Sequence, residues 1–200
     1  MPEHSPQEVA NTETCATGSA PGPHRIHPLA VRRTLAYATD AVSYLGVAAA
    51  TVPLGLLVRR TVGEPSRGLV LALSALPPAI ATAWAAHRES SAHGATWGKN
   101  RFELRVVSEE GTHRLSPGRA IVRNVVKIGG PWQLGHVVAV SAAFGGFDQR
   151  DPLTIGSTII CYPLLGLMSS LVICGSGRGL HDRLARSCVT DVSITADHRR

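Results

Sequence analysis

The chain has 200 residues, with 20 lysines and arginines against 14 acidic residues and a formal net charge of +6. Its length fits a single domain. The positive charge does not indicate nucleic-acid binding, because no RNA- or DNA-binding motif accompanies it and the basic residues adjoin apolar segments. The sequence has no nucleophile elbow, no phosphate-binding glycine loop and no metal-ligand cluster. It therefore predicts no enzyme, no metal and no other cofactor.

The two ends of the chain differ from its middle. Residues 1–30 carry five prolines among Ser, Thr, Glu and His and show no apolar period. Such a segment buries too little surface to offset the entropy of ordering it, so we expect a disordered cytoplasmic tail. It lacks an apolar core followed by a cleavage site, so it is not expected to be a signal peptide. Residues 193–200 are expected to form a short C-terminal tail.

Four long segments between these tails are almost without charge. Asp40 is the only Asp, Glu, Lys or Arg within them, and they are 25, 19, 20 and 25 residues long. A helix of about 20 apolar residues crosses the roughly 30 Å hydrocarbon core of a bilayer. The sequence therefore predicts an all-α membrane protein. We expect a four-helix transmembrane bundle with spans at about 34–58, 68–86, 128–147 and 153–177.

Lysine and arginine are divided unequally between the two sides of this bundle. With four spans, both termini and the loop 87–127 lie on one side, which holds sixteen of the twenty basic residues. The positive-inside rule puts that side in the cytoplasm, so we expect cytoplasmic N- and C-termini in a plasma membrane. Cys15 and Cys188 fall on the same side, where thiols stay reduced, so no disulfide is expected.

The loop 87–127 carries a pattern of its own. Arg101–Val106 alternates charged and apolar residues, which is typical of a half-buried strand, and residues 112–115 are expected to return as its hairpin partner. A serine and a proline then favour a helix start. The helix that follows has a basic stripe, which predicts an amphipathic helix lying in the head-group region. Either the loop staples the cytoplasmic ends of the spans together, or it binds lipid head groups or a partner. The stripe consists of Arg119, Arg123 and Lys127.

Four short motifs lie at the ends of the apolar segments or between them: Arg33–Asp40 (RTLAYATD), Thr96–Lys99 (TWGK), Arg119–Asn124 (RAIVRN) and Leu180–Ala185 (LHDRLA). Their order, with hydrophobic runs between them, resembles the RDD family of bacterial multi-pass membrane proteins. The resemblance covers a domain at about 31–192. The family is named for one arginine and two aspartates, and the resemblance implies that these are Arg33, Asp40 and Asp182.

The two aspartates have two alternative roles. In the structural interpretation, Asp40 pairs with an arginine from elsewhere in the chain, Arg123 or Arg183, and Asp182 anchors the C-terminal segment to the basic loop. In the functional interpretation, Asp40 and Asp182 form a cytoplasm-facing acidic pocket flanked by Arg33 and Arg123, which exchanges a proton for a cation. A carboxylate at the centre of a spanning helix costs roughly 3 kcal/mol on insertion scales, which marks such a residue as a functional candidate.

Several further residues are candidates for the same polar cluster. Two of them are histidines, which either relay protons or form ordinary hydrogen bonds. The candidates are Lys99, Arg119, Arg123, Asn124, His136, His181 and Arg183.

The most direct functional interpretation is a structural or assembly component of a bacterial inner membrane. Its expected partners are anionic lipid head groups, a second copy of the chain or another membrane protein. The alternative is an ion-coupled transporter, because the resemblance implies a link to cation/proton antiport. The environment of Asp40 separates the two: a dry carboxylate favours structure, and a water-accessible carboxylate with a raised pKa favours transport.

Overall fold

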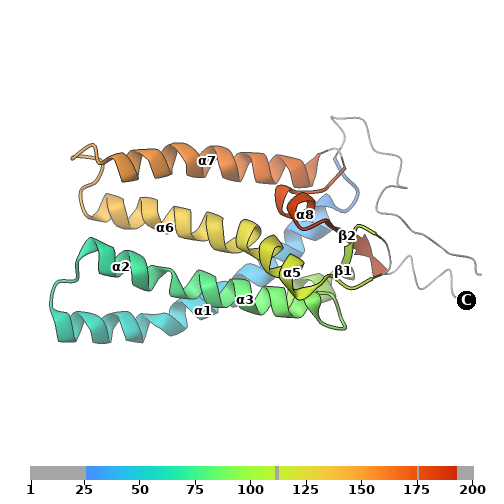
Figure 1. Ribbon diagram of the computed structural model, residues 1–200, viewed down its shortest axis with the longest axis horizontal. Coiled ribbons are helices and arrows are strands. Elements are labelled where there is room, and N and C mark those ends of the chain that lie inside the picture. The colour runs from blue at the N-terminus through green and yellow to red at the C-terminus, as the bar shows by residue number, and fades with distance from the viewer. Residues whose placement is uncertain (1–25, 111–112, 175, 193–200) are drawn as a thin grey trace, which may run out of the picture.

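The computed structural model describes residues 26–110, 113–174 and 176–192, and four helical rods run side by side in it with a small cap at one end (Figure 1). Both ends of the described chain lie at the cap, where Ile26 forms an isolated β-bridge with Cys174. Most of the predicted N-terminal tail and all of the C-terminal tail lie outside the described residues.

The first rod is helix α1 (Ala30–Val62). It ends at Gly63, whose φ of 78° lies in the left-handed region that glycine adopts without strain. Pro53 is accommodated inside the helix. The half of α1 away from the cap is covered with exposed apolar side chains, among them Leu45, Leu56 and Leu57. Such a surface is stable against lipid but not against water.

The second rod is interrupted. Helix α2 (Arg67–Ser74) begins at Ser66, whose hydroxyl accepts from the backbone N–H of Leu69. Helix α3 (Leu76–Ser90) follows after a single residue, Ala75. The break comes immediately before the Pro77–Pro78 pair, because proline supplies no backbone N–H for the preceding turn and disfavours helical backbone before it.

The third rod continues without a gap from the loop helix. Helix α5 (Pro117–Asn124) passes into the π-helical turn η1 (Val125–Gly129) and then into helix α6 (Gly130–Ala143). In the π turn the N–H of Gly130 donates to the carbonyl of Val125, five residues back. Pro131 has no N–H to donate in the next turn, so the regular helical ladder is already broken at this point.

The fourth rod is helix α7 (Pro152–Ile173), which begins at Asp151. The side chain of Asp151 accepts from the N–H of Thr154 at 2.9 Å. Asp151 also lies 2.7 Å from Arg67, and Arg67 donates to Ser141, also at 2.7 Å. These contacts tie the second, third and fourth rods together at the end opposite the cap.

Three helical stretches among the described residues are long and apolar enough to cross a membrane: Ala30–Val62, Arg67–Ser90 and Pro152–Ile173. The predicted third span at 128–147 differs, because helix α6 has only 14 residues and owes its further length to η1 and α5. The observed boundaries therefore agree with three of the four predicted spans, within several residues at each end.

The cap holds the short elements. They include the helices α4 (Trp97–Arg101) and α8 (Leu180–Leu184). They also include the strands β1 (Leu104–Ser108) and β2 (Ser187–Asp191). The strands pair antiparallel, with Val106 opposite Val189. The predicted strand is found in part, shifted to Leu104–Ser108. Of its expected hairpin partner at 112–115, the described residues return to β1 through an isolated antiparallel bridge between Val107 and Arg114, whereas the strand that pairs with β1 is β2. The described residues are mostly helical, which is consistent with the predicted all-α membrane protein, and β1 and β2 add a two-stranded sheet to them.

The predicted amphipathic helix exists as α5, but its orientation was wrong. Its basic residue Arg123 is only 1% exposed, whereas Ile121 and Val122 on the other side are 52% and 47% exposed. Arg123, at the centre of the basic stripe, therefore points into the interior of the protein, whereas the apolar side chains of Ile121 and Val122 point outward. This arrangement suits a helix with lipid on its outer side, because burying the charges among partners costs less there than exposing them to hydrocarbon.

One cysteine prediction also fails. Cys161 and Cys174 are free, but Cys188 is disulfide-bonded, whereas no disulfide was expected.

Candidate functional site

Arg123 lies at the centre of a set of buried charges between the cap and the rods. Its Nη1 is 2.6 Å from Glu89 Oε1 of helix α3. Its Nε and Nη2 donate to Asp182 Oδ1 of helix α8 at 3.0 and 2.8 Å. All three side chains are at most 1% exposed. One guanidinium therefore joins the second rod, the third rod and the C-terminal segment through charge-assisted bonds.

Asp182 has a second arginine partner. Arg33, near the start of helix α1, donates from Nη2 to Asp182 Oδ2 at 2.5 Å, and its Nη1 donates to the carbonyl of Gly177. The N–H of Gly179 also donates to Oδ2, at 3.1 Å. Arg33 is turned into the protein by these bonds, so it does not extend along the membrane surface. The carboxylate of Asp182 thus connects the first rod to the loop helix.

Glu89 is likewise saturated with donors. Lys99 Nζ of helix α4 lies 2.7 Å from Oε1, and Asn124 Nδ2 donates to Oε2, also at 2.7 Å. Asn124 donates in addition to the carbonyl of Ala120, which fixes the amide on its own helix. An isolated carboxylate at this depth would be costly, and these neighbours are what allow Glu89 to be buried as an ion.

Asp40 lies at the far end of the same set. Its Oδ2 accepts from the hydroxyl of Thr96 at 2.5 Å and its Oδ1 accepts from the N–H of Gly98 at 2.7 Å. Lys99 reaches the same Thr96 hydroxyl at 3.3 Å. The predicted pairing of Asp40 with Arg123 or Arg183 was therefore wrong, because helix α4 packs on α1 and supplies neutral donors first.

This packing depends on a glycine. A Cβ on Gly98 would fall 2.1 Å from the carbonyl oxygen of Ala36 and 2.9 Å from Asp40 Oδ1. No side chain fits between these two helices, so the backbone N–H can reach the carboxylate only if residue 98 is glycine.

These contacts form one continuous path, which we call the ion network. It runs through helices α1, α3, α4, α5 and α8 and leaves no network carboxylate exposed. Its members, in order of contact, are Arg33, Asp182, Arg123, Glu89, Lys99, Thr96 and Asp40.

Asp182 and His181 are adjacent titratable residues of helix α8, and burial acts on their pKa values in opposite directions. Burial raises the pKa of Asp182, but Arg123 and Arg33 outweigh this and hold it well below its usual value. Burial lowers the pKa of His181 to about 3, and the adjacent Asp182 carboxylate offsets only part of that effect. His181 is therefore neutral near pH 7, which does not suit a proton relay.

Among the described residues, three of the predicted cluster residues have neither a hydrogen bond nor an ion pair with a member of the ion network. Arg119 bonds Ser108 and Glu110 near the surface. Arg183 donates to the carbonyl of Arg178. His136 accepts from the indole N–H of Trp132 at 3.3 Å, which is an ordinary hydrogen bond within one helix. Arg119 shares the face of Arg123 but lies one helical turn earlier, where strand β1 and the turn after it supply its partners.

Sequence reasoning missed Glu89 altogether. A single carboxylate beside Arg88 at the end of an apolar run resembles an ordinary interfacial charge. A usable signal was present: Glu89 is the only acidic residue between residues 65 and 102, a segment that joins two basic regions.

Among the described residues, no group of three or more His, Cys, Asp and Glu side chains could hold a metal ion. The carboxylates of the ion network are directed to protein donors instead.

Comparisons with known proteins place this geometry in a family. No curated protein and no solved structure matches the chain. A family model does match, over residues 27–186, and it is described as the RDD family. The match includes the arginine and the two aspartates that the sequence analysis singled out, and it agrees with the apolar rods of a membrane protein. The chain therefore belongs to the RDD family, a membrane protein family of unknown function.

Proposed function

We propose that this protein is a non-catalytic, multi-pass membrane protein with a structural or assembly role. The observation that carries the proposal is the ion network, in which every carboxylate is buried and bonded to protein donors. Such an arrangement fixes the relative positions of the helices. It leaves no carboxylate free to bind a substrate or to act as a general base.

The proposal includes four spans. Helix α6 with η1 makes a rod of about 28 Å, close to the thickness of the hydrocarbon core. It lies alongside α7 over most of that helix's length (Figure 1). The exposed apolar residues of α1 and α7 support contact with lipid along the same stretch.

The proposal also includes an orientation. Of the seventeen lysines and arginines in the described part of the chain, thirteen lie on the side of the cap, which supports a cytoplasmic cap in the plasma membrane of a bacterium. The exposed basic residues there would meet anionic head groups, which attract each cation by about 1 kcal/mol. A second copy of the chain or another membrane protein would pack against the apolar rods.

The transport alternative requires a carboxylate that exchanges a proton for a cation. Asp40, its best candidate, is 0% exposed and already accepts two short hydrogen bonds. A carboxylate that is shielded from water and has a hydrogen-bond donor on each oxygen favours the structural role, because a transported cation would have to displace both donors.

The test is ion flux in proteoliposomes of the purified chain under an imposed pH gradient. We expect no cation-dependent collapse of the gradient from the wild type. We expect loss of folded protein in Asp40→Asn, because the two donors meet different carboxylate oxygens and an amide replaces one of these oxygens with an NH2 group. Asp148→Asn, at an exposed position, is the matched control and should fold normally. Flux that is present in the wild type and absent from a folded Asp40→Asn protein would establish the transporter instead.

A further inference from the structure

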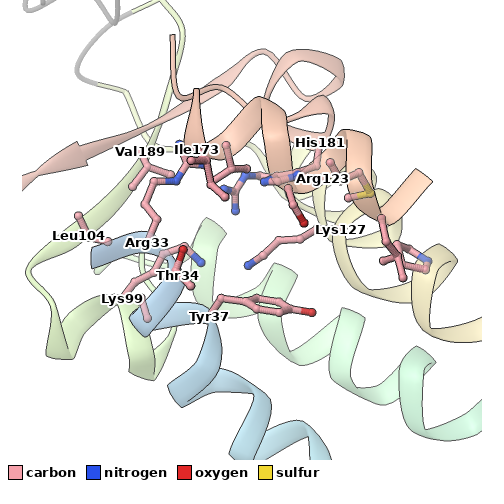
Figure 2. A pocket seen from close by; sticks show the side chains of 16 residues that line it. Arg33, Thr34, Tyr37, Lys99, Leu104, Arg123, Lys127, Ile173, His181 and Val189 are labelled. Atoms are coloured by element: carbon pink, nitrogen blue, oxygen red, sulfur yellow. The ribbon is translucent and has the colours of Figure 1, made fainter. Parts of the chain in front are cut away.

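A cavity of about 270 Å3 lies beside the ion network, between helices α1 and α7 and the turn η1 (Figure 2). Figure 2 shows Lys127 extending from η1 across this space toward Thr34 and Tyr37 of α1. Arg123 and His181 lie along the opposite wall, and the side chain of Arg33 extends from α1 beside Thr34. The cavity thus brings together the cap, where the charges are, and the beginning of the apolar rods.

The wall of the cavity is cationic. Arg33, Lys99, Arg123 and Lys127 line it, whereas the network carboxylates Asp40, Glu89 and Asp182 are not among its lining residues. Three of these four basic side chains are paired with Asp182 or Glu89. In the described part of the chain, Lys127 is the basic residue of this wall that has no ion-pair partner.

The side chain of Lys127 makes few stabilising polar contacts with the described residues. In the described part of the chain its side-chain nitrogen forms no ion pair and no hydrogen bond, and it lies over the ring of Tyr37, 5.1 Å from the ring centroid. A cation–π contact is weaker than the hydration that a half-buried ammonium gives up. The imidazole Nδ1 of His181, a residue only 4% exposed on the same wall, also lacks a partner. These two groups are unsatisfied in the cavity as it stands.

An apolar groove continues from the cavity along the rods. It has a volume of about 350 Å3 and shares Tyr37, Pro131 and Leu165 with the cavity. It extends to Tyr44 and Trp132. Tyr44 lies seven residues beyond Tyr37 on α1, or about 10 Å farther along the helix. The two spaces together have a cationic end at the cap and an apolar end directed toward the middle of the rods.

We propose that this site binds one anionic phospholipid. The phosphate would lie against Lys127 and the neutral His181 imidazole, and an acyl chain would lie along Tyr37, Leu165 and Trp132. The charge pattern excludes a cation and favours an anion, and the adjoining groove favours a ligand with a hydrocarbon chain over a soluble anion. The inference requires a membrane location but not the structural role proposed above, so a flux measurement and a lipid measurement can fail independently.

The test uses Trp132 as a reporter. The full chain, with Trp84→Phe and Trp97→Phe so that Trp132 is its only tryptophan, is reconstituted in phosphatidylcholine vesicles. Brominated phosphatidylglycerol or brominated phosphatidylcholine is added, and quenching is followed against mole fraction. We expect half-maximal quenching at an about fivefold lower fraction of phosphatidylglycerol, the factor for one uncompensated cation beside an anionic head group.

Two variants decide whether Lys127 carries the preference. Lys127→Met should make the two lipids equal. Arg119→Met, at a half-buried position on the same helical stripe that does not line the cavity, should leave the preference unchanged. Because Lys127 has no carboxylate partner, Lys127→Met should also unfold at no lower temperature than wild type in pure phosphatidylcholine.

Three results would overturn the proposal. The first is equal quenching by both lipids in the parent protein. The second is loss of stability in Lys127→Met without any anionic lipid, which would show that the protein itself uses the ammonium. The third is abolition of the preference by millimolar inorganic phosphate, which would assign the cavity to a soluble anion.

Discussion

Replacing Arg123 with methionine tests the ion network at its centre. The variant removes two hydrogen bonds to Asp182, at 3.0 and 2.8 Å, and the 2.6 Å ion pair with Glu89. Removing one partner of a buried ion pair costs about 3–5 kcal/mol. Here neither carboxylate is left bare, because Asp182 keeps Arg33 and Glu89 keeps Lys99. We therefore expect the lower end, about 3 kcal/mol.

The matched control is Arg119→Met, one turn earlier on helix α5. Arg119 contacts Ser108 and Glu110 at 3.1 and 3.3 Å near the surface. Exposed pairs of this kind contribute about 0–1 kcal/mol. Unfolding free energies of both variants and wild type, from titration with a denaturing detergent in mixed micelles, give the comparison. If Arg123→Met costs no more than Arg119→Met, the network does not hold the helices together and the reasoning is wrong.

Three further predictions follow from the same geometry. Gly98→Ala should abolish folded protein in size-exclusion chromatography, because its Cβ would fall 2.1 Å from the Ala36 carbonyl, whereas Gly118→Ala, with nothing within 4 Å, should elute as wild type. Acidification from pH 7 to pH 5 should destabilise the protein by about 2 kcal/mol through His181, whose pKa is 6.5 unfolded and about 3 folded. The unfolded state binds the proton in this window and the folded state does not, so stability rises with pH from about 3 to 6.5; His181→Gln should flatten that part of the denaturation profile. Finally, Val106→Cys with Val189→Cys should form a disulfide on oxidation, seen as a gel shift, because the two residues are directly opposed; the offset pair Val106→Cys with Thr190→Cys should not.

The sequence was most informative where a pattern is local. Uncharged runs predicted helices α1 and α7, and the recurrence of basic residues every four positions predicted helix α5. The direction of α5 was misjudged for a physical reason. Amphipathicity shows that a helix has two faces, but in a membrane protein the apolar face can be the outer one, so Arg123 points inward.

Long-range pairing is what the patterns could not supply. Alternation in Arg101–Val106 predicted a strand, but period alone does not choose a partner, and β2 lies some 80 residues later in the chain. Arg33 and Asp182 are 149 residues apart, and only the resemblance to a family linked them. Asp40 was expected to need an arginine, whereas a hydroxyl and a backbone N–H, brought close by Gly98, satisfy it.

The cap has a consequence for how the protein is made. Asp182 and strand β2 leave the ribosome after all four rods. Arg33 and Arg123 therefore cannot pair with Asp182, and β1 cannot pair with β2, until the C-terminal segment has been made. At translation rates of about 5–20 residues per second, the interval from Arg33 to Asp182 lasts roughly 7 to 30 seconds. During that time membrane insertion proceeds with incompletely paired charges at the cap. Completion of the C-terminal segment is thus the step that commits the nascent chain to its final form.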